Sequence, residues 1–183
     1  RPFSKDRKGT VLGCGAAALV LTNKRAVATS NAYATILSTA LNGDAHHPTS
    51  PEPSGFYMKQ CMDNAIKSAE ITPNDIDLFI PHATGTQLND AIEQRLLAEL
   101  STQSYCQENT LLLKKYIGHT GGASAAFSYL IAALILKQSS GLMGQTKRNV
   151  ALVNATAFGG NNSSSVLAAI NHSSKQEETD GTC

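Results

Sequence analysis

Ile76-Asp-Leu-Phe-Ile-Pro-His-Ala-Thr-Gly-Thr86 sets the architecture expected of this chain. Its apolar run, residues 76–80, predicts a short buried strand, and His82 follows at the carboxyl end of that strand. Residues 88–100 carry leucine and isoleucine at helical spacing, which predicts a helix after the polar loop. Strand, loop and helix in this order are typical of an α/β layered domain.

Further elements alternate in the same way on both sides of this stretch. Apolar residues at three-and-four spacing predict a helix over 56–69, and small apolar residues predict a helix over 123–137 that is buried on more than one side. The last two predicted strands flank a glycine-containing hairpin turn, residues 156–162. The sequence therefore predicts an α/β fold with a mixed, mostly parallel sheet flanked by helices. The remaining predicted strands are 10–22, 32–41, 110–113, 149–154 and 165–170.

The composition argues against several classes of protein. The 183 residues carry a net charge of +1 without a basic run, so nucleic acid is not expected as a partner. No apolar run reaches the roughly 18 to 20 residues that span a bilayer, and the first residues make a poor signal peptide, so a cytoplasmic chain without membrane contact is expected. The four cysteines lack metal-binding or disulfide spacing and are expected to be reduced. The chain opens without Met, which hints at a piece of a longer precursor.

Two histidines stand where predicted elements meet. His82 precedes Thr84-Gly-Thr86, two hydroxyls around a glycine, and His119 stands at the start of the alanine-rich helix. A helix start favours a neutral imidazole, which can donate a hydrogen bond from Nε2 to an enolate or carbonyl oxygen. Because reactive groups collect beyond the carboxyl ends of the strands, His82, His119 and Phe158 are expected to share one site.

Lys114 lies five residues before His119 and has two interpretations. It is either a solvated lysine at the end of a strand or a fixed charge that biases a neighbouring nucleophile or enolate toward its anionic form. Lys115 is the neighbour expected to be solvated. His82 likewise has a structural alternative, since loop histidines are more often structural than catalytic.

Several motifs together resemble the β-ketoacyl-acyl carrier protein synthases, condensing enzymes of the thiolase superfamily. The resemblance runs in order over about residues 1–170 and implies the carboxy-terminal half of a thiolase-like fold. Residues 1–172 would form this half-domain, with 1–30 belonging to the end of the first half of the fold and 173–183 forming a disordered polar tail. The motifs are Arg1-Pro-Phe3, Asp6-Arg7, Gly9 with Val11-Leu-Gly13, Asp44-Ala-His-His-Pro-Thr49 with Pro51, Pro53 and Gly55, His82-Ala-Thr-Gly-Thr86-Gln-Leu-Asn-Asp90, Lys114 to His119 and Phe158-Gly-Gly160-Asn161.

The resemblance implies a decarboxylating Claisen condensation between an acyl thioester and malonyl-acyl carrier protein. It implies no metal and no permanently bound cofactor, and the phosphopantetheine of acyl carrier protein would be the substrate carrier. The residues that it assigns are the catalytic His82, His119 and Lys114, the phosphopantetheine-binding Thr84 and Thr86, and the acyl-pocket gate Phe158, Gly159 and Gly160.

The sequence departs from the family pattern in three respects. The nucleophilic cysteine of the family belongs to the preceding half of the fold, which is absent from this sequence. Cys14 stands where the family commonly has an acidic residue, in an apolar strand expected to make its thiol an inert core group. Ser128, nine residues beyond His119, stands where a glutamate usually pairs with the lysine.

The expected function is therefore the carboxy-terminal part of a split or cleaved β-ketoacyl synthase of fatty acid or type II polyketide synthesis. It would be an acyltransferase only in complex with a chain carrying the nucleophilic cysteine. The expected partners are that amino-terminal half, acyl carrier protein and a second split unit in a dimer. Two alternatives stay open, a non-catalytic subunit like a chain-length factor or scaffold, and a module that only binds carrier protein.

Overall fold

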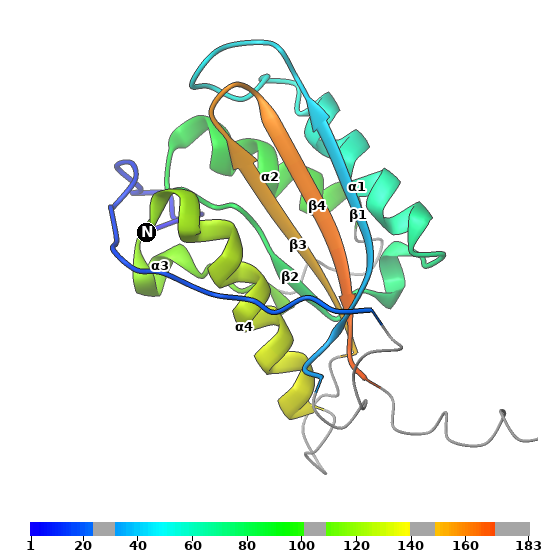
Figure 1. Cartoon of the computed structure of the whole chain (residues 1–183). Coiled ribbons are helices and arrows are strands. Elements are labelled where there is room, and N and C mark those ends of the chain that lie inside the picture. The colour runs from blue at the N-terminus through cyan, green and yellow to red at the C-terminus, as the bar shows by residue number, and fades with distance from the viewer. Residues whose placement is uncertain (24–31, 101–108, 140–148, 171–183) are drawn as a thin grey trace, which may run out of the picture.

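A four-stranded mixed sheet forms the centre of the computed structural model, which describes residues 1–23, 32–100, 109–139 and 149–170 (Figure 1). The strand order is β1-β4-β3-β2. Among these strands β2 and β3 pair in parallel, whereas β1 with β4 and β3 with β4 are antiparallel. The predicted α/β class with a mixed sheet is confirmed, but the pairing is less parallel than expected because a hairpin supplies β3 and β4. The strands are β1 (Thr35–Gly43), β2 (Leu78–Ile80), β3 (Val150–Ala157) and β4 (Asn161–Ala168).

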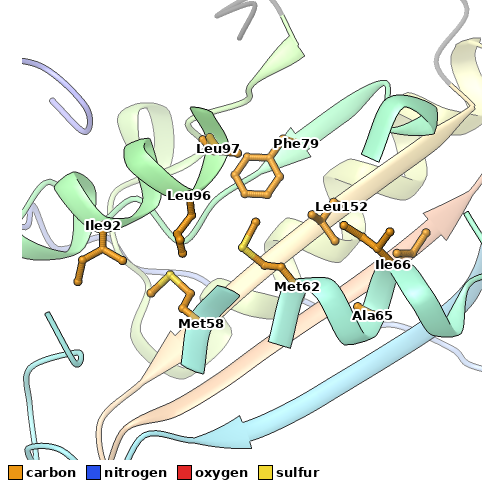
Figure 2. Packing of buried hydrophobic residues seen from close by; sticks show 10 residues of the cluster. Met58, Met62, Ala65, Ile66, Phe79, Ile92, Leu96, Leu97 and Leu152 are labelled. Carbon is orange, nitrogen blue, oxygen red and sulfur yellow. The ribbon is translucent and has the colours of Figure 1, made fainter. Parts of the chain in front are cut away.

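Alternate residues of the strands face two separate apolar clusters, because successive side chains of a strand point to opposite faces. On one face Phe79, Leu152 and Val166 pack against two helices, α1 (Phe56–Ser68) and α2 (Gln87–Leu100). Figure 2 shows Met58 and Met62 of α1 extending toward Leu96 of α2. Both predicted helices are confirmed, and their apolar stripes form this part of the core.

The opposite face of the sheet is covered by α4 (Ser124–Ser139). Its fully buried residues recur every four positions, at Ser124, Ser128, Ala132 and Leu136, and so form a single stripe. The other apolar side chains of α4 are only partly buried. The expectation that this helix is buried on more than one side is therefore not met by the described part of the chain.

The predicted buried strand over residues 10–22 is wrong. This apolar stretch is extended and crosses α4 (Figure 1), where Gly15 approaches Phe127, but its only strand-like pairing among the described residues is the bridge between Leu12 and His119. Because no described strand lies beside this stretch, several of its apolar side chains are exposed to solvent, and Val20 is 95% exposed. Cys14 is exposed as well, which corrects its predicted place in the core.

The connection that leads to Lys114 is not a strand. Of the predicted strand 110–113, only Thr110 bridges to Phe79, and the chain then turns into α3 (Lys114–Ile117). The hairpin turn between β3 and β4 is confirmed, with positive φ at both of its glycines. Two short 3-10 helices are η2 (Pro73–Asp75) and η4 (Gly121–Ala123). In the described ranges no helix has the length and apolar character needed to cross a membrane. The predicted tail, 173–183, lies outside the described residues.

Candidate active site

His82 is held by a buried carboxylate of the following helix. The Oε1 atom of Glu93 accepts a hydrogen bond from the His82 backbone N–H at 2.7 Å, and Oε2 accepts one from Ala83 at 2.6 Å. These bonds hold Ala83 at a φ of 41°, a left-handed conformation that costs free energy for a residue other than glycine. Because α2 begins directly after the loop, its second turn lies beside the loop backbone. The helix therefore fixes where the imidazole of His82 stands.

Asp90, also of α2, ties the same loop to the first residues of the chain. Its carboxylate accepts hydrogen bonds from the backbone N–H groups of Gly85 at 3.0 Å and Phe3 at 2.8 Å, and Arg7 Nε lies 3.7 Å away. Gly85 has a φ of +84°, and a Cβ there would lie 2.7 Å from the carbonyl oxygen of Gly9. Only glycine fits this crossing of two backbones.

Lys114 is buried against His82. Its ammonium donates a hydrogen bond to the His82 carbonyl oxygen, and Nζ lies 3.5 Å from Nδ1 of the same residue. The interpretation of Lys114 as a solvated lysine is therefore wrong, whereas Lys115 is exposed as expected. An ammonium has only donors, so Nδ1 of His82 is the acceptor and the ring proton is on Nε2.

The apolar stretch 10–22 hydrogen-bonds both backbone groups of His119. Its backbone N–H donates to Val11 at 2.8 Å, and its carbonyl accepts from Gly13 at 3.0 Å. Its Nδ1 accepts a hydrogen bond of 3.0 Å from the Gly121 backbone N–H. Because a backbone N–H can only donate, the ring proton of His119 is also on Nε2.

The two imidazoles lie together. Their ring centroids are 5.4 Å apart, and the ring planes meet at 85°. Each ring uses Nδ1 to accept from its own support, and so each has an Nε2–H group left to donate. Two such donors at this separation can bind one developing oxyanion.

Burial and Lys114 keep both rings neutral. Burial lowers the pKa of His82 well below 6.5, and the charges of Lys114 and His119 act in the same direction. Burial also lowers the pKa of His119, with Lys114 as the second cause. The neutral ring predicted for His119 thus has a different physical origin from the helix start to which the sequence pointed. At neutral pH both groups are donors without a charge of their own.

Lys114 faces carboxylates from α2. Burial lowers the pKa of Lys114 to about 8, while the charges of Glu93 and Asp90 oppose this shift. Burial raises the pKa of Glu93 to about 7, opposed by its hydrogen bonds and by Lys114. Ser128 takes no part, since its hydroxyl donates to the Ser124 carbonyl at 3.2 Å. The usual glutamate partner is therefore absent at 128, and α2 supplies the charges opposite the lysine.

The two threonines of the loop lie beside a cavity. Their hydroxyl oxygens, Thr84 Oγ1 and Thr86 Oγ1, are 3.0 Å apart. Thr84 and Lys114 both line a cavity of about 320 Å³ between the first residues of the chain and α3. Thr84 and Lys114 thus lie on one cavity, and the phosphopantetheine-binding role of the two threonines stays a prediction.

Phe158 lies on the β3–β4 turn and is 78% exposed. Two backbone hydrogen bonds join this turn to the loop after β1: the Asp44 N–H donates to the Gly160 carbonyl at 2.9 Å, and the Gly159 N–H donates to the Pro48 carbonyl at 2.7 Å. Because β2 and β3 are parallel, their carboxyl ends lie at the same end of the sheet. His82 follows the carboxyl end of β2, and the turn follows that of β3. The structure thus places the turn on the edge that carries His82, and the gate role stays a prediction.

Sequence reasoning missed the residues that support the histidines. The supporting role of Asp90 and Glu93 was available from the helical spacing, because Asp90, Glu93 and Leu97 are three and four positions apart and share the buried side of α2. A carboxylate on a buried helix face needs partners, and the loop with His82 is the nearest source of backbone N–H groups. Ser124 was missed too, since α4 contains more than one serine and the sequence gave no reason to single out one hydroxyl.

Comparison with known proteins places the chain in a family. Residues 33–142, more than half of the chain, match the family described as "Beta-ketoacyl synthase, C-terminal domain". The chain belongs to the β-ketoacyl synthase family. It is 32% identical to 3-oxoacyl-[acyl-carrier-protein] synthase 2 of Rhizobium meliloti (strain 1021), with 91% of the chain and 45% of that protein covered. It is 29% identical to the mitochondrial 3-oxoacyl-[acyl-carrier-protein] synthase of Arabidopsis thaliana, with 93% and 42% covered. The chain thus spans about half the length of these relatives.

Solved structures of ketosynthases have the same thiolase-like fold. "The ishigamide ketosynthase/chain length factor" superposes with a TM-score of 0.82 at 26% identity, covering 93% of the chain and 47% of that structure. "Ketosynthase (ApeO) in Complex with its Chain Length Factor (ApeC) from Xenorhabdus doucetiae" has a TM-score of 0.64 at 26% identity, covering 73% and 38%. The predicted family and fold are confirmed for the carboxy-terminal half of a β-ketoacyl synthase.

Proposed function

We propose that this chain supplies the histidine side of a β-ketoacyl synthase active site, with His82 and His119 as catalytic residues and Lys114 beside them. The observation that carries the proposal is the pair of neutral imidazoles 5.4 Å apart, each with an Nε2–H group free to donate. The relatives named as 3-oxoacyl-acyl carrier protein synthases support the same chemistry. The pathway would be fatty acid or polyketide synthesis.

The reaction is a decarboxylative Claisen condensation. The bond between the malonyl α-carbon and its carboxylate breaks, carbon dioxide leaves, and the electron pair forms the enolate of the thioester. His82 and His119 donate hydrogen bonds to the enolate oxygen, which lowers the barrier for its formation. The enolate carbon then attacks the acyl thioester on cysteine, a carbon–carbon bond forms, and the cysteine thiolate leaves.

The nucleophilic cysteine would come from the preceding half of the fold, on another chain. Cys61 is unsuitable because burial raises the pKa of its thiol and its Sγ atom donates to the Ala40 carbonyl. Residues 1–30 would then belong to the end of the first half. The uncovered stretch 10–22 supports this division, since a strand of the other half would give its apolar side chains a neighbour.

The substrate would arrive on acyl carrier protein. Thr84 and Thr86 would hydrogen-bond the phosphopantetheine arm at the cavity that Thr84 lines. Phe158 would gate the acyl pocket, with Gly159 and Gly160 providing the left-handed backbone that its turn requires. The assembly would be a dimer of such pairs, in keeping with the twofold symmetry common among oligomers.

A non-catalytic, scaffolding subunit is the second candidate. Ser128 favours it, because a subunit without chemistry would tolerate loss of the glutamate that usually pairs with the lysine. The similarity to two solved ketosynthases that are each paired with a chain length factor favours it as well. The experiment below separates the two candidates.

The test uses this chain assembled with a ketosynthase amino-terminal half that carries the cysteine. We expect His82→Ala and His119→Ala each to lower condensation with malonyl-acyl carrier protein by about 100-fold or more, the scale of losing an oxyanion donor. Acyl loading of the cysteine should persist, because it does not need the enolate. Lys115→Met, at the exposed neighbour of Lys114, is the control and should change neither step. Unchanged condensation in both histidine variants would support the scaffold and overturn the catalytic assignment.

A further inference from the structure

We propose that Ser124 is a positioning residue that holds His119 in its Nε2–H tautomer. This inference rests on the proposed function, because it gives a role to the hydroxyl behind one of the two catalytic imidazoles. Ser124 is the first residue of α4, and its side chain is buried. Its Oγ atom lies 3.3 Å from Nδ1 of His119.

The direction of this hydrogen bond follows from the other partner of Nδ1. The Gly121 backbone N–H donates to Nδ1 at 3.0 Å, which requires a lone pair on that nitrogen. A nitrogen that accepts from Gly121 carries no proton to give to Ser124. The serine hydroxyl is therefore the donor, and Nδ1 accepts two hydrogen bonds.

The serine hydroxyl is itself held in place. Its Oγ atom accepts a hydrogen bond from the Thr120 backbone N–H at 3.1 Å. The hydroxyl proton is therefore directed away from this N–H and can be donated to His119 Nδ1. Thr120 Oγ1 lies 3.2 Å from Ser124 Oγ and can donate its own proton to that oxygen. The resulting chain runs from Thr120 through Ser124 to the imidazole. It orients the ring without adding a charge.

The two rings are thus supported by different chemistry. His82 has a cation, Lys114, beside its Nδ1, whereas His119 has a serine hydroxyl and a backbone N–H. The charged and titratable side chains that act on His119 are Lys114 of α3 and His82 of the facing loop. A hydroxyl that donates to Nδ1 stabilises the neutral ring and opposes protonation, since imidazolium has no acceptor there.

The test compares Ser124→Ala with Ser124→Thr in the assembled enzyme. Ser124→Ala should lower kcat by about threefold to tenfold with little change in KM, the scale of one lost hydrogen bond. Histidine-selective NMR should show a higher pKa for His119 and a larger share of its Nδ1–H tautomer, because one of the two donors to Nδ1 is lost while the Gly121 N–H is kept. The acidic limb of the pH–rate profile should move to higher pH. Ser124→Thr keeps the hydroxyl and should restore both the tautomer and kcat.

Ser128→Ala is the matched control. Ser128 lies one turn further along the same buried stripe, and its hydroxyl donates to the backbone carbonyl of Ser124 at 3.2 Å and not to His119. It should leave the titration and the tautomer of His119 unchanged. A loss of kcat in Ser124→Ala with an unchanged His119 titration would overturn the proposal and leave Ser124 as a helix-start residue only.

The NMR measurement also separates this inference from the proposed function. If the assembled wild-type protein does not condense malonyl groups, the proposed function fails, yet the effect of Ser124 on the tautomer of His119 is still measured. If condensation occurs and the His119 signals of Ser124→Ala match those of the wild type, only the positioning role fails.

Discussion

At the residue scale, the site depends on which nitrogen of each imidazole carries a proton. Lys114 settles this for His82, and Gly121 with Ser124 settles it for His119. The sequence contains both histidines and the lysine at recognisable spacings, so these could be predicted. Their protonation could not, because it depends on burial and on contacts from α2 and α4 that no local pattern shows. Lys114 is an example, since its spacing left a solvated side chain open as an interpretation and the structure buries it.

Lys114→Met in the assembled enzyme should shift the acidic limb of the condensation rate to higher pH. The lysine charge lowers the pKa of both histidines, so removing it raises both values toward 6.5. The wild type should therefore keep neutral rings at a pH where the variant has begun to protonate them. Lys115→Met should keep the wild-type profile. A Lys114→Met profile that coincides with the wild type would contradict the electrostatic role assigned to this lysine.

At the element scale, α2 positions His82, because Glu93 of this helix accepts hydrogen bonds from the backbone of the His82 loop. The helix itself was predictable from its leucine and isoleucine spacing, α1 from apolar residues at three-and-four spacing, α4 from its apolar composition and the β3–β4 hairpin from its turn glycines. Residues 10–22 and 110–113 were predicted as strands and are not, because an apolar run becomes a strand only where a neighbour offers hydrogen bonds. The sequence shows that these runs are apolar, and it cannot show what lies beside them.

Glu93→Gln should destabilise the protein by about 2–4 kcal/mol, because one acceptor oxygen becomes an amide that faces a backbone N–H and Lys114 loses a nearby charge. Glu99→Gln on the same helix is the control. Glu99 is a partly exposed side chain in an i,i+4 pair with Arg95, so its loss should cost no more than about 0.5 kcal/mol. Denaturant unfolding of both variants measures the difference. Equal stabilities would show that the buried carboxylate does not hold the loop.

At the scale of the whole molecule, two layers of helices cover the sheet unequally. Apolar clusters pack on both faces of the sheet, but the stretch 10–22 that crosses α4 exposes apolar side chains, including Leu12 and Val20. Exposed apolar patches of this kind mark interaction surfaces. If the proposed amino-terminal half docks here, it covers the stretch that also hydrogen-bonds His119.

Val20→Asp should therefore weaken assembly with the nucleophile-carrying half by at least about tenfold, because docking would bury an unpaired carboxylate. The change should have little effect on this chain alone, where Val20 is exposed. Phe56→Asp, an exposed apolar position on the α1 side, is the control and should assemble normally. Size-exclusion chromatography of the mixed chains measures the complex. Normal assembly of Val20→Asp would place the partner elsewhere.

The pairing of Val11 and Gly13 with the backbone of His119 has a practical consequence for anyone shortening this protein. A truncation that starts at residue 14 would keep every strand and helix and could still look correctly folded by circular dichroism. It would nevertheless remove both main-chain anchors of the second imidazole. Such a shortened protein should be judged by the behaviour of that ring, not by its secondary structure content.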